Sequence, residues 1–129
     1  MEKKFRVWDG KNMNYCVFVG LGKAFAMSKS FVPKNEIKNA IIMQYTGIKD
    51  RTGKEIYEGD IITLFDTHTR YLNGRWLPPQ DNVVVVWEEN ENSWRVKYLD
   101  SGNLFSAGSS SSWICFAREV IGNIYETQA

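Results

Sequence analysis

Three carboxylates in the stretch MQYTGIKDRTGKEIYEGDII, residues 43–62, are the first candidates for chemistry in this sequence. If Glu58 and Asp60 lie on one continuous strand, their side chains share a face and Glu55 points to the other face. Two carboxylates on one face offer the oxygen ligands that Mg²⁺ and Ca²⁺ prefer. This interpretation predicts a divalent-cation site.

The same stretch also has a purely structural interpretation, which we favour. Gly59 can adopt a positive φ at a bend, and Asp60 beside it can accept backbone N–H groups, as Asp often does in turns. The residues assigned to structural turns are Gly47, Gly53, Gly59 and Asp60. In this interpretation the stretch carries the chain from one strand into the next part of the fold and holds no metal.

Other motifs for catalysis or cofactor binding are incomplete. A phosphate-binding loop needs GxxxxGK[ST], but Gly47 and Gly53 are one residue too far apart and Lys54 is not followed by Ser or Thr. His68 is the only histidine and lies in a polar segment, which argues against a zinc site and against a Cys–His nucleophile pair. The run Ser109–Ser112 lacks the strand–elbow–helix context of a serine hydrolase. We therefore expect no catalytic residues, no cofactor, no metal and no enzymatic activity.

Aromatic and basic residues interleave near residue 10 and again near residue 73. A single-stranded nucleic acid stacks its bases on such rings while the cations follow its phosphates. The residues of this predicted interaction surface are Arg6, Trp8, Lys11, Tyr15, Arg70, Tyr71, Arg75 and Trp76. The alternative, which we favour, is that Trp8 and Tyr15 form a cross-strand pair in a hairpin. Tyr71 and Trp76 would then anchor a loop or a subunit contact.

Charge is divided unevenly along the chain. Residues 1–54 carry eleven Lys/Arg and four Asp/Glu, a balance of +7, whereas residues 55–129 carry five and eleven, a balance of −6, within a net charge of +1. The two halves can screen each other within one fold, or the basic half can attract a polyanion or the acidic half of another copy. We expect a homo-oligomer, with nucleic acid as the alternative partner.

The elements that position these residues are predicted to be strands. Aromatic residues make up 14% of the chain, and short apolar runs alternate with turn residues, as is typical of β-rich proteins. In the C-terminal part we expect strands at residues 61–65, 83–87, 94–99, 113–116 and 121–125, with a 3₁₀ turn at 116–120. Short strands in this order suit a small, partly open barrel of the SH3-like kind.

The N-terminal part is predicted as a separate β element. Residues 4–9 and 13–20 are expected to form a hairpin around Asp9-Gly10, because Asp-Gly is a frequent turn dipeptide. A third strand or a helical turn follows at 20–30, and residues 34–43 are the best candidate for a helix. We predict a mainly β protein with an N-terminal β element over 1–45 and an SH3-like barrel domain over 46–129. A hairpin between 66 and 82, with its tip at Asn73-Gly74, is expected to leave the barrel sheet.

Localisation is predicted from what the sequence lacks. The N-terminus has no apolar signal region, and no run approaches the 18 apolar residues that a membrane helix needs. Cys16 and Cys115 form no metal-binding spacing and are expected to be reduced core residues. We therefore expect a soluble, cytoplasmic protein that does not contact a membrane.

Three segments, KFRVWD followed by Tyr15, MQYTGIKDRTGKEIYEGDII, and REVIGNIYE, together resemble the YopX family of small proteins from bacterial phages and prophages. The resemblance covers both ends and the middle of the chain, but not the serine run or residues 66–82. It implies a β-rich protein with an SH3-type barrel in its C-terminal part, located in the cytoplasm of the bacterial host. It implies no enzymatic activity, no cofactor and no catalytic residues.

Overall fold

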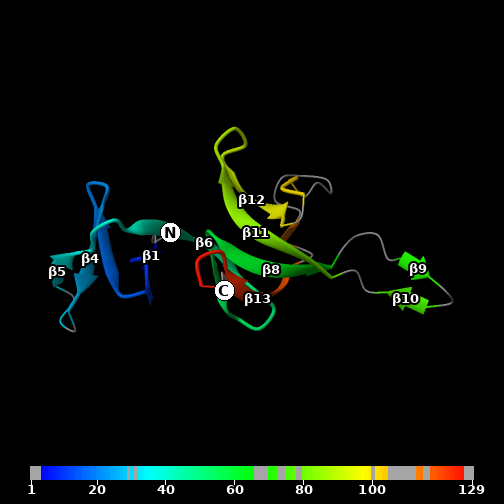
Figure 1. Cartoon of the computed structure of the whole chain (residues 1–129), viewed down its shortest axis with the longest axis horizontal. Helices are drawn as coiled ribbons and strands as arrows, with labels where there is room; N and C mark the ends of the chain where they lie inside the picture. The colour runs from blue at the N-terminus through cyan, green and yellow to red at the C-terminus, as the bar shows by residue number, and fades with distance from the viewer. Residues whose placement is uncertain are drawn as a thin grey trace. The chain divides into compact units, whose positions relative to one another are not determined.

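Strands make up most of the described part of the computed structural model (Figure 1). It describes residues 4–28, 30, 32–65, 70–72, 75–77, 80–99, 101–104, 113–114 and 117–126. These described residues form thirteen strands and one short 3₁₀ turn, and no α-helix lies among them. The prediction of a mainly β protein is therefore confirmed.

The chain divides into two compact units, Met1–Tyr45 (unit 1) and Thr46–Ala129 (unit 2). One strand, β6 (Ile41–Lys49), runs from the first unit into the second. That each unit is an independent domain stays a prediction.

Unit 1 contains two small antiparallel sheets. In the first, β1 (Phe5–Trp8) lies between the start of β6 and the two-residue strand β2 (Met13–Asn14). The turn from β1 to β2 is the predicted one: the Oδ1 atom of Asp9 accepts the backbone N–H groups of Lys11 (2.8 Å) and Asn12 (2.7 Å). The predicted hairpin is shorter than expected, because the chain leaves it after Asn14.

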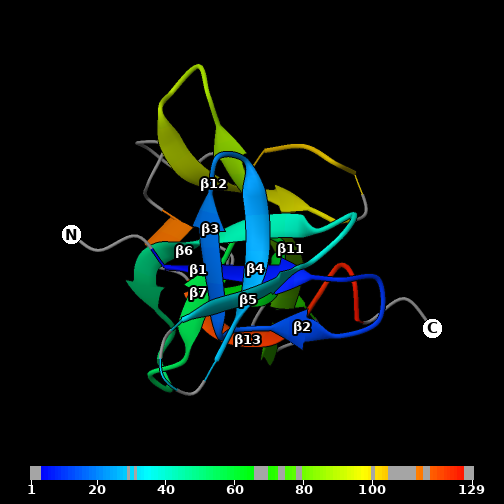
Figure 2. The same cartoon turned by 90° about the vertical axis from the view of Figure 1, so that its left-hand side faces the viewer.

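The second sheet of unit 1 has the order β3-β4-β5, with β3 (Val17–Gly20), β4 (Lys23–Met27) and β5 (Pro33–Glu36). Figure 2 shows the β3–β4 hairpin crossing β1 steeply. The predicted strand within 20–30 is confirmed by β4. The helix considered for 34–43 is wrong, since this segment forms β5, a turn and the start of β6. Asn39 has a φ of 53° in that turn, which interrupts any helix.

Unit 2 is built on a four-stranded antiparallel sheet with the order β12-β11-β8-β13. The strands are β8 (Asp60–Phe65), β11 (Gln80–Glu88), β12 (Ser93–Tyr98) and β13 (Ala117–Asn123). β13 pairs with β8 through two register shifts, which bend this edge. The curled sheet is compatible with an SH3-like barrel, and that finer assignment stays a prediction.

Short elements flank this sheet. The three-residue strand β7 (Glu55–Tyr57) neighbours β6. β9 (Arg70–Leu72) and β10 (Arg75–Leu77) pair as the hairpin predicted between 66 and 82, while its tip at Asn73-Gly74 lies outside the described residues.

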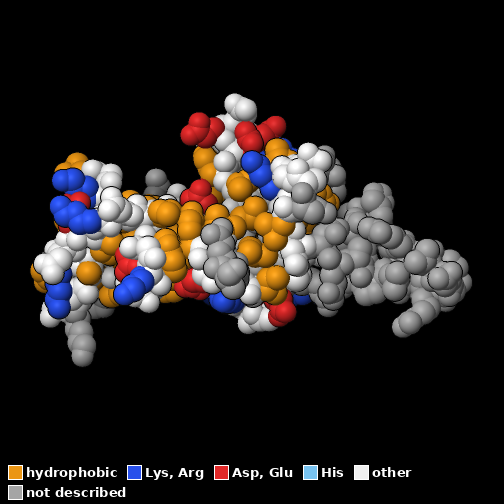
Figure 3. Space-filling view, viewed as in Figure 1, with side chains coloured by type: hydrophobic (Ala, Val, Ile, Leu, Met, Phe, Trp, Pro, Cys, Tyr) orange, Lys and Arg blue, Asp and Glu red, His pale blue; other side chains and the backbone are white. Residues whose placement is uncertain are grey.

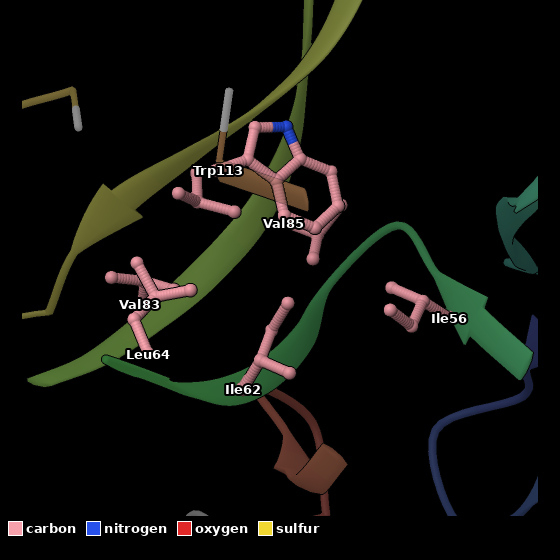
Figure 4. Close-up of a cluster of buried hydrophobic side chains, with 7 residues drawn as sticks. Ile56, Ile62, Leu64, Val83, Val85 and Trp113 are labelled. Carbon is pink, nitrogen blue, oxygen red and sulfur yellow. The ribbon is translucent and has the colours of Figure 1, made fainter. Parts of the chain in front are cut away.

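A single hydrophobic cluster fills unit 2 (Figure 4). Its buried members are Ile56, Ile62, Leu64, Val83, Val85, Val96 and Trp113. Figure 4 shows the indole of Trp113 entering this cluster beside Val85. Full burial of one such side chain contributes about 1.5–3 kcal/mol, so this cluster supplies much of the stability of the unit.

Two sequence predictions near the C-terminus are wrong. Trp113 and Ile114 form a 3₁₀ turn where a strand was expected, and residues 117–120 belong to β13 where a 3₁₀ turn was expected. The reason is tertiary: the indole Nε1–H of Trp113 donates a 2.8 Å hydrogen bond to the carbonyl of Trp94. That bond and the burial of the ring favour a compact turn over an extended strand at this point.

Candidate interaction surfaces

Asp50, in the 43–62 stretch that contains the candidate carboxylates, joins distant segments of unit 2. This side chain is 8% exposed and accepts four hydrogen bonds. Its Oδ1 atom accepts the N–H (2.9 Å) and hydroxyl (2.7 Å) of Thr52 and the N–H of Lys54 (2.9 Å). Its Oδ2 atom accepts the backbone N–H of Val120 at 2.9 Å. One carboxylate therefore closes a local turn and also fastens the last strand, 70 residues further along the chain.

The electrostatic balance at Asp50 favours the ionised form. Burial acts to raise the pKa of this carboxyl, and the hydrogen bonds, with that from Val120 first, lower it by more. As a result the pKa of Asp50 lies below its ordinary value of 3.8. The contact with Val120 is thus a charge-assisted bond, which is stronger than a neutral one.

Gly59 and Asp60 make a second fastening in the same stretch. Gly59 has a φ of 86°, its N–H donates to the carbonyl of Val85 (2.9 Å), and its carbonyl accepts the N–H of Ile124 (3.0 Å). Asp60 is 1% exposed, and its Oδ2 atom accepts the backbone N–H of Tyr57 at 2.8 Å. The structural roles predicted for these two residues match this geometry. We call the contacts of Asp50, Gly59 and Asp60 with their partners the clasp.

The other predicted turn glycines also have positive φ angles. Gly53 (φ 91°) lies in the turn closed by Asp50, as predicted. Gly47 (φ 84°) lies inside β6 and not in a turn. Beside it, the Thr46 hydroxyl donates to the carbonyl of Ile56 at 2.7 Å and accepts the N–H of Ile48. Gly47 therefore accommodates an irregularity in β6, at the point where the chain passes from one unit to the next.

The cation site considered for Glu55, Glu58 and Asp60 does not match the backbone. The strand does not continue through Gly59: β7 ends at Tyr57, and β8 begins at Asp60 after a turn. Glu55 lies 3.5 Å from the hydroxyl of Tyr57, and Asp60 already accepts a backbone N–H group. Within the part of the chain that is described, no group of three or more His, Cys, Asp and Glu side chains converges.

The predicted aromatic and basic surface is divided between the two units. Arg6 is 2% exposed in β1, so it is a buried residue and not part of an open surface. Lys11 is exposed, and Tyr15 is 57% exposed. Trp8 is half-buried and lies opposite Met13 in the β1–β2 register, so it is not directly opposite Tyr15. The pairing of these two rings stays a prediction.

The remaining predicted surface residues lie on the β9–β10 hairpin of unit 2. The strand register places Trp76 opposite Tyr71, with Arg75 opposite Leu72 and Arg70 opposite Leu77. His68 and Ser109–Ser112 lie outside the described residues.

An exposed aromatic face on unit 1 was missed by the sequence analysis. Strand register places Phe18 opposite Phe25, and Phe25 opposite Glu36. The residues on this side of the β3-β4-β5 sheet, which we call the Phe18 face, are Phe18, Gly20, Lys23, Phe25, Met27 and Glu36. Phe18 is 46% exposed, whereas Ala24 on the opposite side is 1% exposed. The apolar run that contains Phe18 could not reveal which side faces outward, and neither could it show that Cys16, expected in the core, is exposed.

A second exposed feature is the acidic free end of the β11–β12 hairpin in unit 2. Trp87 and Trp94 face each other across the hairpin, with ring centroids 4.9 Å apart in an edge-to-face arrangement, and Trp87 is 40% exposed. Beyond them the turn carries the exposed side chains of Glu89 and Glu91. Figure 3 shows the acidic side chains at this free end, above hydrophobic side chains over β8 and β11. We call Trp87, Glu89 and Glu91 the hairpin tip.

Comparison with known proteins agrees with the resemblance carried by the clasp segments. The family model described as YopX protein matches residues 4–128. The chain belongs to the YopX family. The solved structure of YopX from Bacillus subtilis is similar, with a TM-score of 0.55 and 22% identity over 95% of this chain and 92% of that chain. Protein EF1440 from Enterococcus faecalis is also similar, with a TM-score of 0.56 and 23% identity over 98% and 95% of the two chains. A search of curated proteins gave no match.

Membership of the YopX family has a direct physical counterpart in the clasp. The two longest segments of the resemblance, residues 43–62 and 118–126, are joined by the bonds from Val120 to Asp50 and from Ile124 to Gly59. These two segments thus help to hold the fold of unit 2. Of the described residues in this YopX chain, none belongs to a helix that could cross a membrane.

Proposed function

We propose that this YopX-family chain is a non-enzymatic interaction module that associates with further copies of itself. The phage or prophage context and the cytoplasm of a bacterial host, which the resemblance implies, are part of this proposal. The observation that supports it most is the charge of the two units. Residues 1–45 carry eight Lys/Arg and three Asp/Glu, a net +5, and residues 46–129 carry eight and twelve, a net −4.

Opposite charge on two compact units favours contact between copies. A basic unit of one copy attracts the acidic unit of the next, and such complementarity speeds encounter and selects orientation. Because the two surfaces differ, each contact leaves one of each kind free for a further copy. Contacts of this kind produce a closed ring if the rotation closes and an open chain if it does not.

The absence of enzymatic activity is the second part of the proposal. Asp50 and Asp60, the buried carboxylates of the 43–62 stretch, both accept backbone N–H groups. Both carboxylates are also buried, at 8% and 1% exposed, so they offer little surface to a substrate or a cation in solution. This supports a structural use of the stretch.

Light scattering after size exclusion tests self-association. At low salt we expect a molar mass above the 14.9 kDa of one chain, falling towards 14.9 kDa as salt increases. The reason is that the Debye length shrinks to about 8 Å at physiological ionic strength and to about 3 Å at 1 M. A monomer whose mass is insensitive to salt would contradict the proposal.

Nucleic-acid binding by the basic N-terminal half and its aromatics is the alternative. The exposure of both Tyr15 and Lys11 favours it. The burial of Arg6 weakens it. A gel-shift titration with a single-stranded oligonucleotide discriminates, because phosphate contacts make affinity fall steeply with salt. Absence of a shift at low salt would remove this alternative.

A further inference from the structure

The Phe18 face is an ordered aromatic platform. The ring of Phe18 contacts that of Phe25, with centroids 6.2 Å apart. It also lies over Gly20, where an added Cβ would come within 3.1 Å of the Phe18 Cε1 atom. Glycine at this position therefore lets the ring lie against the sheet. An aromatic ring fixed in this way loses little conformational entropy when a partner covers it.

The turn between β3 and β4 carries backbone strain that no contact within the fold explains. Leu21 has a φ of 54° and is 102% exposed, so its side chain packs against nothing in the fold. It shares a two-residue turn with Gly22 (φ 72°), and such turns prefer Asn at the first position. A bulky residue with positive φ is an outlier, and outliers of this kind concentrate where a protein binds its partners.

Basic side chains border the platform. Lys23 is exposed on the Phe18 face, and Lys34 is exposed on the neighbouring strand β5. The side chain of Lys23 is 60% exposed even though its Nζ lies 4.0 Å from Glu36. A partner that matches the platform needs an aromatic or apolar centre and carboxylates around it. The hairpin tip of unit 2 has this composition, since the exposed Trp87 is followed by Glu89 and Glu91.

We propose that the Phe18 face of one copy binds the hairpin tip of a second copy. This rests on the proposed self-association and names its two surfaces. Trp87 packs on the Phe18 platform, and Glu89 and Glu91 lie opposite Lys23 and Lys34. The pairing of aromatic anchors inside a charged rim is the usual arrangement of an interface. The contact joins two different surfaces, so it extends from copy to copy.

Charge exchange tests this contact on the full chain. The first variant carries Lys23→Glu and Lys34→Glu, and the second carries Glu89→Lys and Glu91→Lys. Each alone brings like charges together, and we expect its dissociation constant in light scattering to increase by at least about tenfold. A mixture of the two, or the four substitutions in one chain, restores opposite charges and is expected to restore the oligomer. Phe18→Ser is expected to weaken assembly without rescue by either charge variant.

Matched controls separate this contact from general electrostatics. Lys11→Glu and Glu119→Lys each reverse one charge, in the same direction as the face and tip variants, at exposed positions outside both surfaces. Both are expected to assemble like the natural chain. If they disrupt the oligomer as strongly, the assignment of the two surfaces is wrong. If the natural chain assembles and the face and tip variants assemble equally well, this inference is wrong and self-association stands. If the natural chain is a monomer at every salt concentration, both are wrong. Circular dichroism establishes that each variant is folded.

Discussion

Replacing Asp50 with Asn is the sharpest test of the clasp, because the substitution preserves shape and removes a single acceptor. The amide oxygen can still accept the three bonds now made to Oδ1, from Thr52 and Lys54. The amide nitrogen then faces the N–H of Val120, which loses its acceptor. A buried donor left without a partner costs about 1–3 kcal/mol. We expect Asp50→Asn to lower the free energy of unfolding by about 2 kcal/mol, or about 30-fold in the folding equilibrium.

Denaturant titration followed by tryptophan fluorescence measures this loss, since Trp113 reports on the core of unit 2. Glu119→Gln is the matched control: it makes the same change on an exposed side chain next to Val120 and should shift stability by less than about 0.5 kcal/mol. Amide exchange gives a local reading, in which Val120 should lose more protection than Ile124, whose bond to the Gly59 carbonyl is unaltered. Equal stability of the two variants would refute the role given to Asp50.

The ionisation of Asp50 should make the free energy of unfolding depend on pH. The pKa of Asp50 is lower in the folded chain than its ordinary value of 3.8, so its contribution is present above that value and is lost as pH falls through the folded pKa. The stability difference between the natural chain and Asp50→Asn should therefore be constant near neutral pH and shrink below about pH 4. A difference that stays constant down to pH 2 would show that ionisation of Asp50 does not matter.

Three further substitutions have defined outcomes in the same titrations. Gly59→Ala should lower the free energy of unfolding by about 2 kcal/mol, because two backbone hydrogen bonds hold this residue at a φ of 86°. Gly53→Ala should lower it by about 1 kcal/mol, because Gly53 has a φ of 91° but lies in open space. Equal losses for the two variants would contradict this difference. Trp113→Ala should lower the free energy of unfolding by about 3–5 kcal/mol. Trp113→Phe should lower it clearly less, because phenylalanine keeps most of the buried volume and only the indole hydrogen bond is lost. Leu21→Asn should stabilise the β3–β4 turn by up to about 1 kcal/mol and weaken self-association in light scattering. Unchanged or stronger self-association would contradict the inference that this strained turn contributes to binding.

Strand positions were predictable where side-chain chemistry is local. β8, β11 and β12 coincide closely with the β-branched and alternating runs expected as strands. β5 was missed because its sequence, PKNE, is polar and begins with Pro. Pro is tolerated at the first residue of an edge strand, and the pairing of β5 with β4 supplies what its composition lacks.

Contacts between distant segments were beyond prediction. The sequence places Asp50 in a turn but gives no sign that its second oxygen accepts the N–H of Val120. Likewise, the residues that follow Trp113 favour a strand by local propensity, and the sequence does not show the hydrogen bond from Trp113 to the Trp94 carbonyl. The outward side of β3 could not be chosen either, because Val17, Phe18 and Val19 are all apolar. Each of these depends on packing, which overrides local propensity.

The clasp also decides what family membership can say about function. Two of the three segments that carry the YopX resemblance, residues 43–62 and 118–126, are joined by the bonds from Val120 to Asp50 and from Ile124 to Gly59. Because these two segments make contacts that hold unit 2 together, sequence similarity within them is evidence about the fold. The Phe18 face and the hairpin tip lie outside them, and each carries a large exposed aromatic side chain, Phe18 and Trp87. A search for the role of this chain should therefore begin at these two surfaces, where a substitution can change binding and leave the clasp intact.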